Sequence, residues 1–344
     1  MYSVIKIAKK NISILCLVML VTMDAYSQQG IPFTQYIFNS MAINPAYTGY
    51  KEEWYGQLGL RSQWTGWEGA PTIGALTVDG VLDQSEKKHG VGLQVNGERF
   101  GAESAINAYA NYALRLKLSE DGEERLSLGI AAGVTQYGLN GDKFKSDETE
   151  DMLVPADRET NTHPDIHLGV YYHNPNWFVG LSVQDLFAKS KAEEDRQFLQ
   201  NSLGTTSRNM QGYLTGGMLN QLASDLMLRS SFLIREDFKQ PTTLDLNTVL
   251  IFNDKFWAGL GYRSRAYLFT QPDNVATPNT LVRRSSSLNA IFLFAVNSRF
   301  RIGYSYDHQF LNKVSGGQGG SHEVTLGISF GKGADKQGLN RRYF

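Results

Sequence analysis

The stretch SHEVTLGISF, residues 321–330, decides the fold class because its side chains alternate in kind with a period of two. Large apolar side chains occupy every second position, namely Val324, Leu326, Ile328 and Phe330. Thr, Gly and Ser occupy the positions between them. An extended chain places alternate side chains on opposite faces, so this stretch is typical of a β-strand with one apolar face and one face of small or polar groups.

The same alternation recurs in about 14 segments from Glu53 onward, and many of them run to about ten residues. About ten residues suffice to cross a bilayer when the strand is tilted. The second face is mostly Gly, Ala, Ser or Asn, which suits the interior of a barrel better than a surface in bulk water. We therefore predict an all-β fold, a transmembrane antiparallel β-barrel of about 14 strands over residues 53–330. The alternative is a soluble β domain.

The lengths of the connections favour the barrel. Every second connection is short, at residues 173–176, 223–224, 253–254 and 297–298. Most of those between them are long, at residues 138–164, 188–206, 271–283 and 308–321. Outer-membrane barrels have short turns on the periplasmic side and long loops on the extracellular side. We therefore expect short periplasmic turns, long extracellular loops and an even number of strands.

The first residues predict export to the outer membrane. Three lysines precede the apolar run 12–21, and small residues at 25–27 suit cleavage. We predict a signal peptide over residues 1–27 and a mature chain that begins at Gln28. About ten apolar residues are too few to span a bilayer as an anchor. The single cysteine, Cys16, lies within the signal, so we expect no disulfide in the mature protein.

Residues 28–52 lie between the signal peptide and the first predicted strand, and they include the aromatic and amide-rich stretch PFTQYIFNSMAINPAYTGY, residues 32–50. A barrel of about 14 strands with a glycine-rich inner face encloses more space than its own side chains fill. We predict that this segment is a lumen plug; the alternative is a short periplasmic helix and linker. The candidate site residues are Phe33, Gln35, Tyr36, Phe38, Asn39, Asn44, Pro45, Tyr47 and Gly49.

The stretch FTQYIFNSMAINPAYTGY, directly after a signal peptide, resembles the start of the PorP/SprF family, membrane components of the type IX secretion system of Bacteroidetes. The resemblance continues through LRSQWTGWEGAPTI, residues 60–73, and departs from the family pattern at Ser40, where proline is common. It implies an outer-membrane protein that acts in secretion or gliding motility through contacts with other proteins.

Two roles are open within the family. One kind of member links the outer membrane to periplasmic lipoproteins of the machinery. The other assists the export or surface anchoring of a secreted adhesin that carries its own C-terminal sorting domain. The sequence does not separate these two roles, and neither requires catalysis.

Residues 331–344 follow the last predicted strand, and we expect a periplasmic C-terminal tail there. Phe330 is interpreted as the aromatic residue that ends the last strand, and Phe344 is its rival as the signal for barrel assembly. Basic residues in the tail suit contact with an acidic partner, and an inert tail is the simpler interpretation.

No motif nominates a catalytic, cofactor or metal site, and we predict that the protein is not an enzyme. His163, His167 and His173 lie near Asp165 in the sequence without a known ligand spacing. The acidic stretch 146–151 lacks the Asp-x-Asp-x-Asp-Gly order of a calcium loop. The formal net charge of −1 argues against a nucleic-acid partner, because no basic excess is present to neutralise phosphates.

Two other functions are compatible with a barrel. A passive outer-membrane porin would have an open lumen lined with charge, to which Arg229, Arg263, Arg299 and Arg301 would contribute. A lipid-modifying barrel enzyme would need a Ser and His pair near the outer rim, and no such pair can be selected from the sequence.

Overall fold

The computed structural model describes residues 33–141, 158–187, 209–238, 241–266, 286–310 and 319–330, together with Phe344. The predicted signal peptide, residues 1–27, lies outside the described residues, as do residues 331–343 of the predicted tail. Most of the long connections also lie outside them, at residues 142–157, 188–208, 267–285 and 311–318. Within the described part of the chain, no helix has the length and hydropathy needed to cross a membrane.

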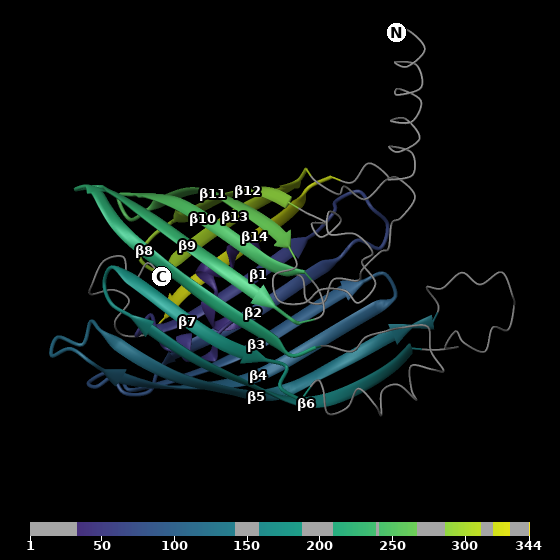
Figure 1. Ribbon diagram of the computed structural model, residues 1–344, viewed down its shortest axis with the longest axis horizontal. Coiled ribbons are helices and arrows are strands. Elements are labelled where there is room, and N and C mark those ends of the chain that lie inside the picture. Colours follow the sequence, from purple (N-terminus) through teal and green to yellow (C-terminus); the bar gives the residue numbers. More distant parts are fainter. Residues whose placement is uncertain are drawn as a thin grey trace, which may run out of the picture. The chain divides into compact units, whose positions relative to one another are not determined.

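The strands of the described chain form one closed antiparallel barrel (Figure 1). In chain order the strands are β1 (Trp54–Ser62), β2 (Thr72–Val81), β3 (His89–Phe100), β4 (Glu103–Lys117), β5 (Arg125–Asn140), β6 (Arg158–His173), β7 (Trp177–Gln184), β8 (Gln211–Ala223), β9 (Leu226–Glu236), β10 (Thr242–Phe252), β11 (Phe256–Ala266), β12 (Ser286–Ala295), β13 (Phe300–Gln309) and β14 (Ser321–Phe330). Each strand pairs with its neighbours in sequence, and β1 pairs with β14 to close the ring. The prediction of an all-β antiparallel barrel of about 14 strands is confirmed.

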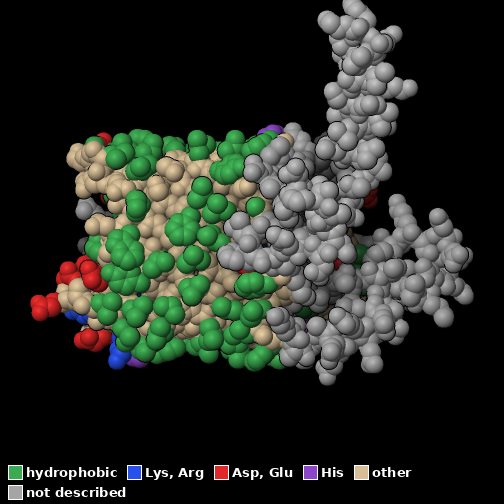
Figure 2. All heavy atoms as spheres, in the orientation of Figure 1, with side chains coloured by type: hydrophobic (Ala, Val, Ile, Leu, Met, Phe, Trp, Pro, Cys, Tyr) green, Lys and Arg blue, Asp and Glu red, His purple; other side chains and the backbone are tan. Residues whose placement is uncertain are grey.

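The stretch SHEVTLGISF forms β14, and its two faces differ as the sequence predicts. Val324 and Leu326 are 49% and 42% exposed, whereas Thr325 between them is buried. Apolar side chains spread over the outer surface of the barrel (Figure 2). A surface of this kind suits the hydrocarbon core of a bilayer.

The inner face carries small residues, as predicted, and it also carries large buried polar groups. Arg115 and Arg229 are each 1% exposed, and Arg61 is 5% exposed. All three contact residues 33–53, which precede β1 and lie inside the barrel. We call residues 33–53 the lumen segment.

The connections alternate in length over the second half of the barrel only. Short turns join β6 to β7, β8 to β9, β10 to β11 and β12 to β13, at residues 174–176, 224–225, 253–255 and 296–299. We call this end of the barrel the short-turn end and the opposite end the long-loop end. In the first half, Gly101 and Ala102 alone join β3 to β4 at the long-loop end, and Gly101 has the positive φ of +57° that tight hairpins require.

Candidate functional site in the barrel lumen

The lumen segment folds as three short 3₁₀ helices, η1 (Thr34–Phe38), η2 (Ser40–Ala42) and η3 (Pro45–Tyr47). Pro45 occupies the first position of η3, where its missing N–H costs no hydrogen bond. Asn44 precedes it in an extended conformation, and its Oδ1 accepts a hydrogen bond from the Ala46 N–H at 2.9 Å. Gly49 then adopts a φ of +77°, which turns the chain toward β1. Helices this short are not stable alone, so the barrel wall must hold them.

The structure places all nine predicted site residues in one continuous path inside the barrel (Figure 1). The buried members are Gln35, Tyr36, Phe38, Asn44, Pro45, Tyr47 and Gly49, and the half-buried members are Phe33 and Asn39. Helix η1 lies against β13 and β14, and η3 lies against β4, β5 and β6. The residues therefore follow the length of the lumen and do not converge on one point.

An ionic clamp holds the start of the lumen segment near the long-loop end. The Arg61 guanidinium of β1 donates to Glu323 of β14 at 3.1 Å and to Asp307 of β13 at 2.5 Å. The Glu323 carboxylate also accepts the backbone N–H groups of Thr34 at 2.7 Å and Gln35 at 3.0 Å. These N–H groups open η1 and have no partner within it, so the carboxylate stabilises the start of that helix.

Hydrogen bonds from wall side chains hold the middle of the lumen segment. Ser182 donates to the Ile43 carbonyl at 2.5 Å, and Gln184 donates to the Ala42 carbonyl at 3.1 Å. In the other direction, the Asn44 amide donates to the Val170 carbonyl of β6 at 3.0 Å. Each bond satisfies a polar group that is buried between the segment and the wall, where an unpaired group costs about 1–3 kcal/mol.

Glycines in the wall allow the lumen segment to approach the strands closely. A Cβ added at Gly129 of β5 would lie 2.1 Å from the Ala46 nitrogen, and one at Gly90 of β3 would lie 2.2 Å from the Thr48 oxygen. Both contacts are with backbone atoms of the lumen segment, which cannot rotate away as a side chain can. The small-residue inner face predicted from the sequence is therefore the surface against which η3 packs.

A second ionic clamp holds the end of the lumen segment at the short-turn end. The Glu52 carboxylate accepts from Arg115 of β4 at 3.1 Å and from Lys87 at 2.6 Å, and it lies 3.6 Å from Arg125 of β5. Lys87 lies in the connection between β2 and β3. One carboxylate thereby ties the segment to three parts of the wall.

Lys51, next to this clamp, has a buried side-chain amine. Its Nζ lies 4.4 Å from the centre of the Tyr55 ring, within reach of a cation–π interaction. Burial, together with the positive charge of Arg301, lowers the pKa of Lys51 from its ordinary value of 10.5 to about 7. Asp79 and Glu53 act in the opposite direction.

An aromatic cluster fills the lumen near the second clamp, toward the short-turn end. Tyr47 and Tyr50 stack at 4.9 Å between ring centres, and both meet the ring of Tyr171 edge-on. Phe178 of β7 packs on the same cluster. A separate cluster forms around Phe38, whose ring lies 5.5 Å from that of Trp257. These contacts bury the rings of Phe38 and Tyr47, which are among the candidate site residues predicted from the sequence.

Phe344, expected in a periplasmic tail, is buried in this aromatic cluster. Its ring lies 4.8 Å from that of Phe178, and its backbone oxygen accepts a hydrogen bond from the Tyr47 hydroxyl at 2.5 Å. The guanidinium carbon of Arg229 lies 5.9 Å from the centre of the same ring. No feature of the sequence indicated this contact.

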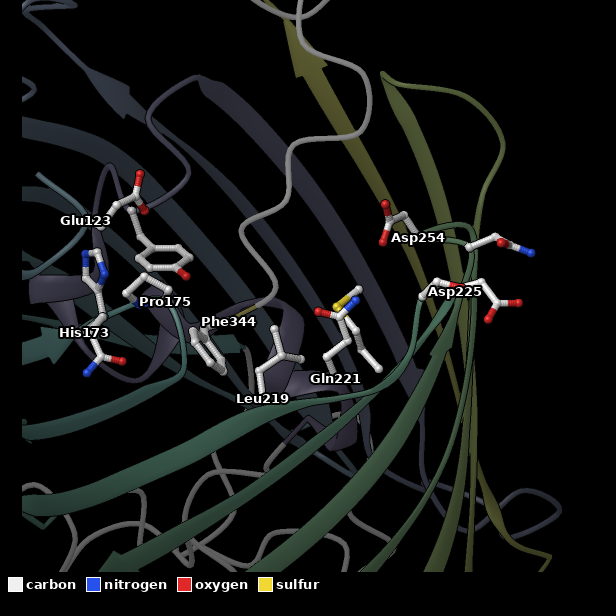
Figure 3. Close-up of a pocket in the computed structure, with 13 residues that line it drawn as sticks. Glu123, His173, Pro175, Leu219, Gln221, Asp225, Asp254 and Phe344 are labelled. Carbon is white, nitrogen blue, oxygen red and sulfur yellow. The ribbon is translucent and has the colours of Figure 1, made fainter. Parts of the chain in front are cut away.

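A cavity of about 500 Å³ opens beside Phe344 at the short-turn end (Figure 3). Leu219 and Phe344 form an apolar part of its lining, and Glu123, Asp225 and Asp254 are acidic residues around it. A cavity with an apolar floor and an acidic rim has the chemistry to receive an apolar side chain that is flanked by basic residues.

Residues 25–328 match the family described as type IX secretion system membrane protein PorP/SprF. The chain belongs to the PorP/SprF family. The match therefore extends beyond residues 33–49 to all of the barrel except the last two residues of β14. Membership makes the protein an outer-membrane barrel of type IX secretion and implies that it works with other components of that system. Comparison with curated proteins gives no match.

Solved structures similar to this PorP/SprF protein are outer-membrane barrels. The CymD monoaromatic hydrocarbon channel is 11% identical, with a TM-score of 0.54, over 85% of this chain and 92% of that chain. A Pseudomonas aeruginosa FadL homologue is 12% identical, with a TM-score of 0.47, over 86% of this chain and 94% of that chain. At these identities the likeness to CymD concerns the fold alone.

Sequence reasoning missed the two ionic clamps of this PorP/SprF barrel. The period of two already places Asp307 on the inner face of its strand, so a buried charge there was predictable. The partner of Asp307 was not predictable, because Arg61 is separated from Asp307 by most of the chain. The two residues meet because β1, β14 and β13 are consecutive around the closed barrel.

Replacing Arg61 with methionine should destabilise the folded barrel by about 3–5 kcal/mol, because Asp307 and Glu323 would remain buried without their cation. Unfolding by guanidinium chloride in detergent, followed by tryptophan fluorescence, measures this change. Arg99→Met, at an exposed position on β3, is the matched control and should change the unfolding free energy little. Equal stability of the two variants would show that the clamp adds no net stability.

The buried Lys51 should make stability depend on pH. Between about pH 7 and 10.5 the unfolded chain holds a proton on this amine that the folded chain does not, so the unfolded state binds more protons and stability rises with pH. Lys51→Met removes this contribution. The difference in Tm between the variant and the original protein should therefore be largest at pH 6 and should shrink by pH 10. A difference in Tm that does not change with pH would contradict a lowered pKa for Lys51.

Proposed function

We propose that this protein is a closed barrel that serves type IX secretion by binding other proteins and not by conducting solutes or by catalysis. The observation that supports this most strongly is the lumen segment, which is clamped at both ends and hydrogen-bonded to the wall between them. Such a segment leaves the lumen filled where a porin would be open.

Three of the four arginines expected to line a porin are engaged in the described structure, and the fourth, Arg299, is exposed in the turn between β12 and β13. Arg229 donates to the Ile37 carbonyl of the lumen segment at 3.1 Å, and Arg263 pairs with Asp245 across neighbouring strands. The Arg301 guanidinium carbon lies 6.0 Å from the centre of the Tyr55 ring. Arginines held in this way stabilise the interior and offer little to a passing anion.

Of the two family roles, we propose the link to periplasmic components of the machinery. The cavity at the short-turn end supports this role, because a concave surface with an apolar floor suits a protein partner. Its acidic rim suits a partner with basic residues around an apolar anchor. Contact with a secreted adhesin is the competing role, and it would use the long connections outside the described residues.

Conductance in planar bilayers tests whether the barrel is closed. The intact protein should give no large steady channels. Gly129→Val should open the barrel, because its side chain would overlap the backbone of Pro45 and Ala46. Gly97→Val is the matched control and should stay closed, because a Cβ added there meets nothing within 4 Å. Large steady channels in the intact protein would favour the porin.

Co-purification from outer-membrane fractions tests the partner. Reversing the charges of the cavity rim, with Glu123→Lys and Asp225→Lys, should remove periplasmic lipoproteins of the secretion system from the purified material. Glu68→Lys, at an exposed position between β1 and β2, is the control and should leave them bound. A single large surface protein in place of the lipoproteins, unaffected by the rim variants, would favour the adhesin role.

A further inference from the structure

Three potential metal ligands converge on the inner wall of the barrel, away from the lumen clamps. Asp165 and His167 lie on the inward face of β6, two residues apart. Asp185 follows the last residue of β7. One ligand atom from each lies within 4.8 Å of the others, and each residue is at most 6% exposed.

The path of β7 creates this convergence. The pairing of β7 with β6 ends at Val183, which lies opposite Leu168. The part of β6 between Leu168 and its first residue, Arg158, has no paired residue of β7 beside it. Asp185 has a φ of +55°, and the next N–H, that of Leu186, donates to the Ile166 carbonyl at 3.4 Å. The chain that leaves β7 therefore stays beside β6 at Ile166, between Asp165 and His167.

Two carboxylates approach the same imidazole nitrogen. His167 Nε2 lies 3.1 Å from Asp165 Oδ2 and 4.0 Å from Asp185 Oδ1. Neutral imidazole carries a single N–H, so one Nε2 can donate to only one of these carboxylates. Ligand atoms of a tetrahedral zinc site lie about 3.3–3.6 Å apart, and the two distances bracket that range. A cation between the three atoms could coordinate both carboxylates and the nitrogen together.

Neighbouring groups hold Asp165 in the orientation of a ligand. The Tyr109 hydroxyl of β4 donates to Asp165 Oδ2 at 3.3 Å, and the Phe187 N–H donates to Oδ1 at 3.2 Å. The Tyr109 ring reaches β6 because Gly133 of β5 lies between them, where a Cβ would come 2.6 Å from the ring. Hydrogen bonds of this kind orient carboxylates in metal sites.

We propose that Asp165, His167 and Asp185 bind a divalent transition-metal ion, for which one imidazole and two carboxylates are the appropriate donors and zinc the representative ion. The other histidines of β6 lie apart from the cluster. His163 lies beside Tyr137, and His173 meets the ring of Tyr50 edge-on at 4.8 Å. The sequence did not predict this site, because the three histidines have no known ligand spacing and Asp185 lies on another strand connection, 18 residues after His167.

Zinc titration of the full chain in detergent, after removal of metals with EDTA, tests this site. Isothermal titration should show one zinc per chain, and zinc should raise the Tm of the barrel. Asp185→Asn and His167→Gln should each weaken zinc binding at least about tenfold. His163→Gln is the matched control on the same strand and should bind zinc as the original protein does.

Cobalt gives a test that needs no variant. Co²⁺ bound by the three side chains should produce visible absorption bands that zinc then removes by displacement. No zinc binding, zinc binding retained in the Asp185→Asn and His167→Gln double variant, or binding of calcium in preference to zinc would each overturn the proposal. In the first case the cluster is a hydrogen-bonded Asp and His pair only.

Discussion

The structure depends on the absence of water from the hydrocarbon core of a bilayer. There, every backbone N–H and C=O must find a partner within the protein, and a sheet meets this requirement only when it closes on itself. The pairing of β1 with β14 supplies the closure, from Trp54 opposite Phe330 to Ser62 opposite His322. Closure removes the free edges, and it also creates an interior that something must fill.

The lumen segment fills this interior, and the charges around it follow from that arrangement. A buried carboxylate is tolerated only with a cation and further hydrogen bonds beside it. Glu323 has both, from Arg61 and from the N–H groups that open η1. Glu52 has cations from three parts of the wall. The ionic groups of the lumen therefore fix the position of the segment as well as satisfying each other.

The small residues of the inner face have a related role. Gly90 and Gly129 do not simply line a channel, because the backbone of the lumen segment rests directly on them. Gly133 similarly leaves room for the Tyr109 ring to reach Asp165. An outer-membrane barrel of type IX secretion built in this way has an interior that is filled along the lumen segment, which suits a protein that presents surfaces to other components of the machinery.

The sequence by itself determined the alternation of faces, the approximate number of strands and the family. Each of these depends on patterns among residues that are neighbours in the chain. The position of residues 33–49 in the lumen was also predictable, because their aromatic rings can pack against the glycine-rich inner face of the barrel. Only the tertiary structure decided which charges meet. Arg61 faces Asp307, and Asp185 faces His167, through the order and register of strands, and register depends on hydrogen bonds between segments far apart in sequence.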